Sequence, residues 1–594
     1  MMKPIFEFDD NSYLLGQVRE VDTRKISLSV NDDNDLRKAK VSQLVTIALS
    51  GASSLWLIGN IDKIIKKSVS VQTDENDGNI YNDVNIYYER FNYLGEQIVN
   101  TVRLTLVGTV SWNAYNSQYL FSRSIQHVPE IDSDCYVLRD AQLESFMKIL
   151  STEGDKEYSL ELGKYTIDES ATAYLDGNKF FQRHAAILGS TGSGKSWTVA
   201  SILERAAKLP SANLVVFDLH GEYRKLSYAK HLRIPGPDEL GTFSKGLLYL
   251  PYWLLNADEM QAMFIDRSEF SAHNQVMAFQ DAVIEQKKTT LKNEGKDEVL
   301  NAFTLDSPVP FSLKNVIEKL RSLNEEMVAG ARGLKQGQFF GQFSRLLTRL
   351  QSKLSDKRYG FLFNAPASEH EYEAMSNLAE KLMDYSKKGG QIKIIDFSEV
   401  PADIIPVIVG IVARVIYQIQ FWTEHDKRRP LALVCDEAHL YLPKKEGQNP
   451  IEIRAIEAFE KIAKEGRKYG VALLVISQRP SDISPTILSQ CNNVIALRLT
   501  NAEDQNTVRK LLPETLESLL EMLPIMDIGE VLVVGDAVLL PSRIKINPPQ
   551  EKPLSATIDF WSEWIKEAEK PDFIKAVENM RQQDSRRLEW RSFL

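Results

Sequence analysis

The sequence predicts an α/β protein with a wound parallel sheet, preceded by a small domain of β-strands. Three observations carry this prediction. The first ~130 residues contain short apolar runs with near period-2 alternation, which is typical of a small barrel or sandwich. Later, short continuous apolar runs alternate with helix-period segments, as buried parallel strands and their crossover helices do. A Gly-rich segment sits at the junction of one such strand and helix.

The β-strand domain is expected within residues 1–150, together with a linker helix near Ala141 to Leu150. Its candidate strands share alternating apolar side chains and are Leu14 to Val30, Leu44 to Leu49, Leu55 to Ile58 and Val102 to Val110. Thr73 to Asp83 is rich in Asn, Asp and Gly and indicates an exposed hairpin loop.

The α/β core is expected in two parts, residues 151–256 and 386–554. Its short apolar runs are Ala185 to Leu188, Leu214 to Phe217, Ile392 to Ile395, Leu431 to Cys435, Val471 to Ile476 and Val494 to Leu497. Residues 257–385 are mostly helical in pattern and predict an insertion within this core. Residues 555–594 carry helix-period apolar side chains and predict a helical C-terminal extension with an Arg-rich end.

Composition excludes several classes of protein. The 594 residues carry a formal charge of −10, so any nucleic-acid contact must come from a local basic surface. Three separated cysteines exclude a disulfide scaffold, and no Cys or His pair has zinc-ligand spacing. The longest apolar run, Ile404 to Ala413, is shorter than the ~20 residues of a membrane span. We expect a cytoplasmic protein without a membrane partner.

The strongest local signal is Gly189-Ser-Thr-Gly-Ser-Gly-Lys-Ser196, a complete G-x-x-x-x-G-K-[ST] segment between an apolar strand and a helix. Its glycines let backbone N–H groups surround phosphate oxygens at a helix N-terminus. Lys195 is expected to reach the β- and γ-phosphates, and Ser196 to hold Mg²⁺. The predicted nucleotide-binding residues of this segment are Gly189, Ser190, Thr191, Gly192, Ser193, Gly194, Lys195, Ser196 and Trp197.

A second acidic strand end is required by such a loop. The run Leu431 to Cys435 ends in Asp436-Glu437. Asp436 is expected to support Mg²⁺, and Glu437 to polarise the attacking water, which favours hydrolysis over a passive nucleotide switch. An acidic pair that only caps the next helix is the alternative.

Three further residues are candidates for catalysis. Gln478 follows the run Val471 to Ile476 and can bond both the γ-phosphate and the lytic water, although a turn residue would suit the same position. Arg467 lies at the end of a predicted helix. It is either a solvated cation that interacts favourably with the helix C-terminus or an arginine finger for a neighbouring subunit. Arg183, twelve residues before Lys195, is a second finger candidate.

These segments together resemble the HerA-type DNA translocases of the HerA/FtsK group of RecA-like ring ATPases. The resemblance rests on blocks spread over most of the chain: Arg183-His-Ala-Ala-Ile-Leu with the Gly-rich loop, Phe217-Asp218-Leu-His220-Gly-Glu222-Tyr223, Leu250-Pro-Tyr-Trp253, Pro308-Val-Pro-Phe311, Asp436-Glu-Ala-His439 and Glu465-Gly-Arg467-Lys-Tyr-Gly470. The N-terminal strands resemble the small β-barrel that precedes the ATPase core in this family.

The resemblance implies a RecA-like P-loop core with an N-terminal barrel, ATP and Mg²⁺ as cofactors, and a homo-hexameric ring around double-stranded DNA. It implies that Arg467 and Arg183 complete a neighbour's site, and it places Asp218 and Glu222 near the nucleotide. It also implies a C-terminal tail that latches onto an adjacent subunit. Bacterial relatives pair with a nuclease or a sirtuin-like NAD-degrading effector in phage defence, and this association predicts such a partner here.

DNA contact is predicted on a basic stretch from Arg332 to Arg358, whose only acid is Asp356. Arg345, Arg349 and Lys353 recur every four positions and share one helix face. They would contact phosphate without reading bases, and a solvated helix or a subunit contact is the alternative. Lys444 and Lys445 are a second candidate.

The function predicted from these observations is an ATP-dependent translocase or helicase on double-stranded DNA. Two alternatives stay open. One is a scaffold ring that organises an effector, with hydrolysis incidental. The other is a conjugation- or secretion-type ATPase, which shares the core.

Overall fold

The structure is a computed structural model of the 594-residue chain. It describes residues 5–8, 12–41, 43–49, 55–70, 96–113, 115, 118–152, 159–167, 169–237, 239–242, 246–330, 333–384, 390–398, 400–512, 517–554, 560–566 and 573–582. The hairpin loop predicted at Thr73 to Asp83 and the Arg-rich C-terminal end lie outside these residues. The chain divides into two compact units, each described separately below.

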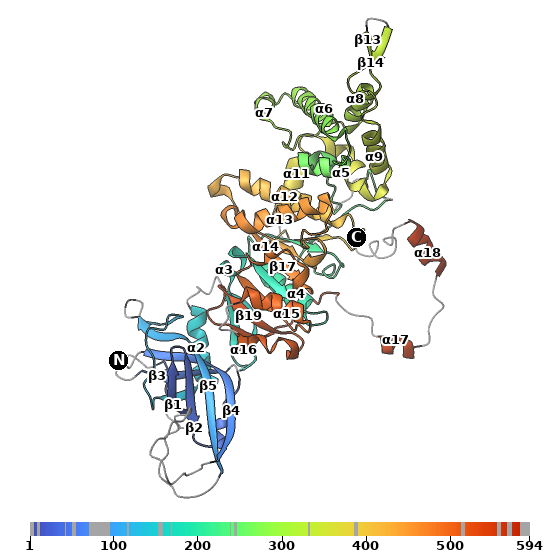
Figure 1. The fold of residues 1–594 in the computed structure, drawn as a ribbon. Coiled ribbons are helices and arrows are strands. Elements are labelled where there is room, and N and C mark those ends of the chain that lie inside the picture. Colours follow the sequence, from blue (N-terminus) through green and yellow to red (C-terminus); the bar gives the residue numbers. More distant parts are fainter. Residues whose placement is uncertain are drawn as a thin grey trace, which may run out of the picture. The chain divides into compact units, whose positions relative to one another are not determined.

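Unit 1 comprises Met1–Gly177, Glu514–Met522 and Leu532–Lys545. Its main feature is a closed antiparallel barrel, drawn in blue in Figure 1. The barrel strands, in spatial order, are β2 (Lys25–Val30), β1 (Leu14–Asp22), β7 (Asp134–Val137), β3 (Leu44–Ala48), β4 (Leu55–Ser70) and β5 (Glu96–Asn113). The ring closes because β2 also pairs with β5. Alternate apolar side chains of these strands, such as Val18, Val45 and Leu104, fill the barrel core.

Unit 1 also contains several helices and strands outside the barrel. They are α1 (Asp33–Leu36), β6 (Gln118–Ser122), α2 (Asp140–Thr152), β8 (Ser159–Tyr165), β9 (Thr172–Asp176), α16 (Glu517–Leu520), and β19 (Glu530–Gly535) and β20 (Ser542–Ile546), which fall largely in this unit. Strands β19, β20, β8 and β9 are consecutive neighbours in a sheet. Arg123 donates hydrogen bonds to the backbone oxygens of Leu539 (2.8 Å) and Gly535 (3.0 Å), which joins the segment after β6 to the β19–β20 connection.

Unit 2 contains the predicted α/β core. Its parallel strands, in spatial order, are β12 (Lys230–Arg233), β15 (Ile392–Asp396), β11 (Leu214–Asp218), β16 (Leu431–Cys435), β17 (Val471–Ser477), β10 (Ala185–Leu188) and β18 (Asn493–Ala496). Each strand pairs with its neighbours in parallel. The six strands predicted here are present, with β18 shifted by one residue, and the predicted fold class is confirmed.

The helices of the core connect these strands. They are α3 (Gly177–Gln182), α4 (Lys195–Ala207), α12 (Ile405–Trp422), η5 (His425–Lys427), η6 (Ala438–Leu440), α13 (Pro450–Tyr469), η7 (Pro480–Asp482), α14 (Pro485–Leu488), α15 (Ala502–Leu511) and η9 (Leu523–Ile525). Helices α12 and α13 lie side by side (Figure 1), and α13 begins with a capping box of Asn449 and Glu452.

Helix α12 is long and apolar enough to cross a membrane by length and composition, the one such helix in the described part of the chain. Most of it is buried inside unit 2, where Ile408, Val409 and Val412 are fully covered. Burial within the unit accounts for its apolar composition, because a helix that is hydrophobic all round can be the core helix of a large domain.

The helical insertion predicted after Ala257 is also present. Its helices are α5 (Ala257–Phe264), α6 (Ala272–Asn293), α7 (Asp297–Ala302), α8 (Leu313–Glu325), α9 (Ser344–Ser355), η3 (Lys357–Tyr359), α10 (Gly360–Phe363), η4 (Ala367–His370) and α11 (Ala374–Met383), preceded by η2 (Tyr252–Leu254). A hairpin of β13 (Met327–Gly330) and β14 (Gly333–Gln336) extends beyond α8 (Figure 1), and the sequence pattern did not predict it.

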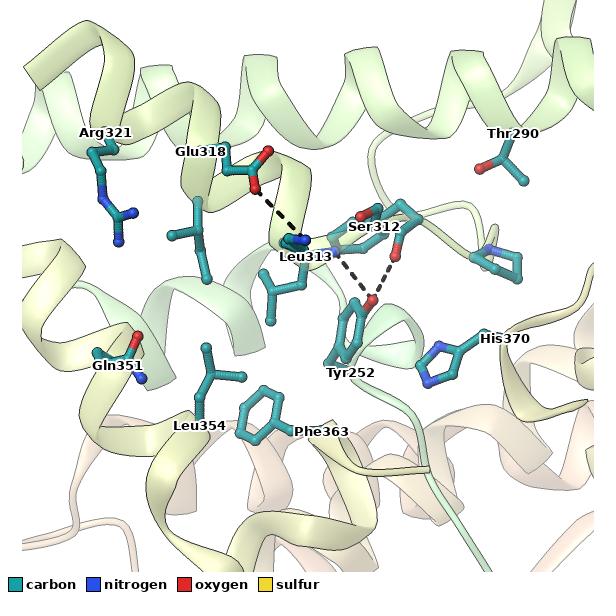
Figure 2. Close-up of a pocket in the computed structure, with 14 residues that line it drawn as sticks. Tyr252, Thr290, Ser312, Leu313, Glu318, Arg321, Gln351, Leu354, Phe363 and His370 are labelled. Carbon is teal, nitrogen blue, oxygen red and sulfur yellow. Dashed lines mark hydrogen bonds and ion pairs between the residues drawn. The ribbon is translucent and has the colours of Figure 1, made fainter. Parts of the chain in front are cut away.

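The insertion, together with Tyr252, lines an open pocket of about 650 Å³ (Figure 2). Leu313, Leu354 and Phe363 are among the apolar residues that line it. The Tyr252 hydroxyl donates to the Phe311 carbonyl oxygen (2.6 Å) and accepts from the Leu313 N–H (3.1 Å), which joins η2 to the start of α8.

Two short helices follow the core near the C-terminus, α17 (Phe560–Ile565) and α18 (Phe573–Gln582). Their apolar side chains are exposed, including Trp561, Trp564 and Ile574. The predicted helical extension is therefore present over the residues described.

Candidate nucleotide-binding and catalytic site

The candidate site lies where the parallel strands of unit 2 end. Register places Leu188 beside Ser477, Val475 beside Cys435, and Cys435 beside Phe217. Since parallel strands end at the same edge of a sheet, the Gly-rich loop and the residues after β17, β16 and β11 meet there. Residues far apart in sequence are thereby brought to one edge: Lys195, Gln478, Asp436, Glu437 and Asp218.

The Gly-rich loop joins β10 to α4, as the motif requires. Gly192 (φ 72°) and Gly194 (φ 104°) have left-handed backbone conformations, which residues with a side chain rarely adopt. The Gly529 N–H donates to the Ser193 carbonyl oxygen (2.9 Å) and supports the loop from the segment before β19. The Ser193 hydroxyl is buried without a hydrogen-bond partner in the described part of the chain.

Lys195 is almost buried and donates to the backbone oxygen of Ser190 (3.2 Å). Burial lowers its pKa, and the carboxylates of Glu437, Asp436 and Glu222 act in the opposite direction. The charges of three acids thus act on the lysine ammonium, which belongs to the loop residue expected to reach phosphate oxygens.

Asp436 and Glu437 follow β16 directly. Asp436 is buried, and its Oδ1 accepts from the Glu437 N–H (3.0 Å). Burial raises the pKa of Asp436 far above its usual range, and neighbouring Glu437, Asp218 and Glu222 raise it further. This carboxyl cluster is the kind of site in which a bound cation stabilises the charged form.

Glu437 has φ 44°, a left-handed conformation that is strained for a residue with a side chain and costs of order 1–3 kcal/mol. Burial raises the pKa of Glu437, while Lys195 and His220 lower it. Its Oε2 is buried without a hydrogen bond and lies 3.3 Å from His439 Nδ1, whose own pKa is lowered by burial. A carboxylate with a free buried oxygen can accept a proton from water, as a general base does.

Asp218, predicted near the nucleotide, holds the loop that follows β11. Its two oxygens accept the N–H groups of Glu222 (3.0 Å) and Tyr223 (2.9 Å). Burial, with the nearby Asp396, raises the pKa of Asp218 to about 7. The structure thus gives Asp218 a role in orienting Glu222, whose carboxylate acts on Lys195.

Gln478 and the Gly-rich loop are in contact, because the Thr191 hydroxyl donates to Gln478 Oε1. Ser196 and Trp197 begin α4 and are half-buried. Lys552 Nζ lies 5.6 Å from the centre of the Trp197 ring. These positions are compatible with the predicted contacts to nucleotide.

The two finger candidates lie elsewhere in unit 2. Arg467 is exposed on the last turn of α13, and its guanidinium forms no hydrogen bond or ion pair with the described residues. Arg183 is half-buried just before β10, and its carbonyl oxygen accepts from the Asn492 N–H (3.1 Å). Neither arginine is among the groups whose charges shift the pKa of Lys195 or of Glu437.

The basic side chains predicted to contact DNA fall into two groups, those already bonded within the chain and those exposed to solvent. Arg349 is paired with Glu269, Lys353 donates to the Tyr359 hydroxyl (2.9 Å), and Lys445 is paired with Glu460 (2.9 Å). Arg345 and Lys444 are exposed. Arg332 lies outside the described residues.

Two features of the site have no signal in the sequence analysis. The buried His184 accepts the Leu473 N–H at Nδ1 (2.9 Å), and its Nε2 lies 3.1 Å from the Ala463 carbonyl oxygen, which ties β10 to β17 and α13. The segment after β20 runs along α4: Gln550 N–H donates to Glu204 (2.7 Å), and Leu554 N–H donates to the Glu222 carbonyl oxygen (2.7 Å). Only long-range contacts reveal either one.

The donor set fits a magnesium nucleotide. Among the described residues there is no cluster of three or more His, Cys, Asp or Glu side chains arranged as a metal site. Mg²⁺ bound to phosphates needs only one or two protein ligands and keeps several waters. Asp436 and the Ser196 hydroxyl can supply them, and the unpaired Ser193 and Glu437 oxygens are the atoms that a polar ligand would satisfy.

A parallel sheet, a Gly-rich loop at a helix N-terminus and an acidic pair on a neighbouring strand define a P-loop ATPase. Residues 160–416 match a family model described as Helicase HerA, central domain. The chain is 26% identical over 448 residues to the DNA double-strand break repair helicase HerA of Saccharolobus solfataricus, covering 73% of this chain and 77% of that protein. It is also 26% identical over 422 residues to the Pyrococcus furiosus HerA, covering 65% of this chain and 69% of that protein.

Among solved structures, VirB4 of Thermoanaerobacter pseudethanolicus aligns with a TM-score of 0.43 and 19% identity, covering 66% of this chain and 98% of that one. The bacterial conjugative coupling protein TrwB aligns with a TM-score of 0.43 and 14% identity, covering 69% of this chain and 93% of that one.

Proposed function

We propose that this chain is an ATP-driven motor that moves double-stranded DNA or separates its strands, working in the cytoplasm as a homo-hexameric ring. The observation that carries the hydrolytic part is the placement of Glu437, whose buried Oε2 accepts no hydrogen bond from the described residues, beside Lys195 and the Gly-rich loop. The DNA part is supported by the HerA-type central domain and by relatives named as helicases.

In this proposal, Mg²⁺-ATP supplies the phosphoanhydride bond whose hydrolysis drives movement. Lys195 and the backbone N–H groups of the loop bind the phosphates, and Ser196 and Asp436 hold the metal. Glu437 takes a proton from the attacking water, and Gln478 orients that water and reports the state of the γ-phosphate to β17. Asp218 keeps Glu222 in place near Lys195.

A ring explains the position of Arg467. An exposed guanidinium without a partner among the described residues is available to a neighbour's nucleotide, where an arginine finger stabilises transition-state charge. Arg183 is proposed as a second contributor. The exposed apolar side chains of α17 and α18 support the proposal that the C-terminal extension latches onto an adjacent subunit.

For DNA, the exposed Arg345 and Lys444 are the stronger candidates, since Arg349, Lys353 and Lys445 already have intrachain partners. Phosphate contacts of this kind position a duplex without reading its bases. A partner effector, either a nuclease or a sirtuin-like NAD-degrading protein acting in phage defence, is proposed from the family resemblance alone.

The proposal is tested by ATP hydrolysis with and without long linear double-stranded DNA at two salt concentrations, with Lys195→Ala as the blank. We expect strong stimulation by DNA that weakens as salt rises, because phosphate contacts release counterions. Hydrolysis that ignores DNA would contradict the motor and favour a scaffold ring that organises an effector.

Glu437→Gln separates the motor from the scaffold in a second way. Loss of the general base should lower the hydrolysis rate by a factor of about 10²–10⁴ while nucleotide still binds. A motor loses its function with hydrolysis, whereas a scaffold keeps its assembly and most of its activity. Glu446→Gln, in the exposed loop after Lys445, is the control.

A further inference from the structure

The side chain of Tyr223 is fully buried, and its hydroxyl has no hydrogen-bond partner among the described residues. Such atoms are rare, because a buried hydroxyl that gives up water without gaining a partner destabilises the folded state. A phenylalanine would fill the same space without this cost. We therefore expect the Tyr223 hydroxyl to gain a hydrogen-bond partner in another state of the protein, such as a ligand-bound one.

The backbone around Tyr223 fixes where the ring lies. Its N–H donates to Asp218 Oδ2 (2.9 Å), and its carbonyl oxygen accepts from the Leu226 N–H (3.2 Å). Tyr223 follows Glu222 directly, and Glu222 is in turn held by Asp218 Oδ1 (3.0 Å). The ring thus belongs to the same rigid turn as the acid beside Lys195.

Asp218, which anchors Tyr223, and Asp436 follow the paired residues Phe217 and Cys435 of the neighbouring strands β11 and β16, so both carboxylates lie at the strand ends beside this turn. Burial raises the pKa of the Tyr223 hydroxyl, and the charge of Asp436 raises it further. Both oxygens of Asp218 already accept backbone N–H groups. Among the described residues, the Asp436 carboxylate accepts a hydrogen bond at Oδ1, from the Glu437 N–H (3.0 Å). Its second oxygen remains for a metal ion or for a further donor.

We propose that Tyr223 is a positioning residue of the nucleotide site, whose hydroxyl donates a hydrogen bond to the Asp436 carboxylate when Mg²⁺ and nucleotide are bound. This inference rests on the proposed ATP site and adds a residue to it. The hydrogen bond would orient Asp436 toward the metal, as outer partners of metal-ligating carboxylates do. Binding of Mg²⁺ and nucleotide would then offset part of the free energy by which the unpaired hydroxyl destabilises the ligand-free protein.

The test compares Tyr223→Phe with Tyr441→Phe in the full chain. Tyr441 is a matched control, because it is equally buried but its hydroxyl already donates to the Asp436 carbonyl oxygen (2.9 Å). Thermal unfolding and fluorescent-nucleotide binding are measured with a non-hydrolysable ATP analogue, in Mg²⁺ and in EDTA.

For Tyr223→Phe we expect a melting temperature without ligand at or above that of the wild type. We expect about tenfold weaker binding of the analogue in Mg²⁺, because a hydrogen bond to a charged group is lost, and unchanged binding in EDTA. Tyr441→Phe should melt earlier without ligand and keep its Mg²⁺-dependent affinity.

A Tyr223→Phe protein that melts as early as Tyr441→Phe, or that binds the analogue in Mg²⁺ as tightly as the wild type, overturns the inference. Failure of the proposed ATP site would give a different result. The wild type itself would then show no Mg²⁺-dependent binding of the analogue, and Lys195→Ala would bind the analogue as the wild type does.

Discussion

At the scale of single residues, Lys393 is a charged side chain placed inside a parallel sheet. It lies fully buried in β15, where its ammonium donates to the Asn213 side chain and to the Gly390 carbonyl oxygen (3.0 Å). Burial lowers the pKa of Lys393 to about 7, with the charge of Lys230 acting in the same direction and that of Asp384 against it. Folding therefore favours the neutral amine.

This pKa predicts a rise of stability with pH. Between about pH 7 and 10.5 the unfolded chain binds the proton that the folded chain has lost, so the free energy of unfolding increases with pH across this window, by at most about 1.4 kcal/mol per pH unit. Lys393→Met should remove this part of the pH dependence in denaturant unfolding. Lys287, whose pKa is lowered to about 8 by burial, also makes stability rise with pH, and it does so equally in the wild type and in Lys393→Met.

The control is Lys288→Met, an exposed lysine on α6. It should leave the pH dependence unchanged. The interpretation is wrong if Lys393→Met and Lys288→Met follow the same curve between pH 7 and 10.

The residues that the sequence could predict are those whose chemistry is local. Lys195 and Glu437 stand in short motifs at strand ends, and both are found at one edge of the sheet. Ion pairs between residues far apart in sequence could not be predicted in this way. Arg349 meets Glu269, which is 80 residues away, and nothing in a basic helix face indicates that partner. The unpaired hydroxyl of Tyr223 is likewise a property of packing.

At the scale of elements, strands were predictable in proportion to their burial. β10 and β16, buried over their whole length, have the predicted bounds. β12, with the sequence Lys-His-Leu-Arg, has one buried side chain at the edge of the sheet, and it escaped detection. The hairpin of β13 and β14 escaped for the same reason, since β14 is exposed throughout.

The close approach of α12 and α13 predicts a sensitive position. A Cβ at Gly410 would lie 2.9 Å from Ala455 Cβ and 3.0 Å from Ala455 Cα, so any side chain there must push the helices apart. We expect Gly410→Ala to lower the melting temperature and Gly410→Val to lower it further, by a destabilisation of about 1–3 kcal/mol.

Trp422→Val, at the exposed end of the same helix, controls for the effect of a β-branched residue in α12. Because α13 carries Arg467 at its end, Gly410→Val should also reduce hydrolysis in the assembled protein. Equal melting temperatures for Gly410→Val and Trp422→Val would show that the helices can separate without cost.

At the scale of the whole molecule, the proposed function leaves each chain with an incomplete arrangement for phosphoryl transfer. Lys195, Glu437 and Gln478 are gathered at one sheet edge, while Arg467 stands exposed at the end of α13. The apolar side chains of α17 and α18 are also exposed among the described residues. Both features are expected of a subunit that is completed by its neighbours.

Mixed assemblies test this completion directly. Lys195→Ala and Arg467→Ala chains, carrying different tags, are co-expressed and purified through both tags. Each variant alone should be inactive. In an equal random mixture, about a quarter of the sites pair an intact Lys195 with a neighbour's intact Arg467, so hydrolysis should recover to roughly that fraction if the finger acts between subunits. Co-expression of Lys195→Ala with Glu437→Gln is the control, because both residues act in one chain's site and no mixed site is intact. An Arg467 that serves its own chain would give no recovery in either mixture.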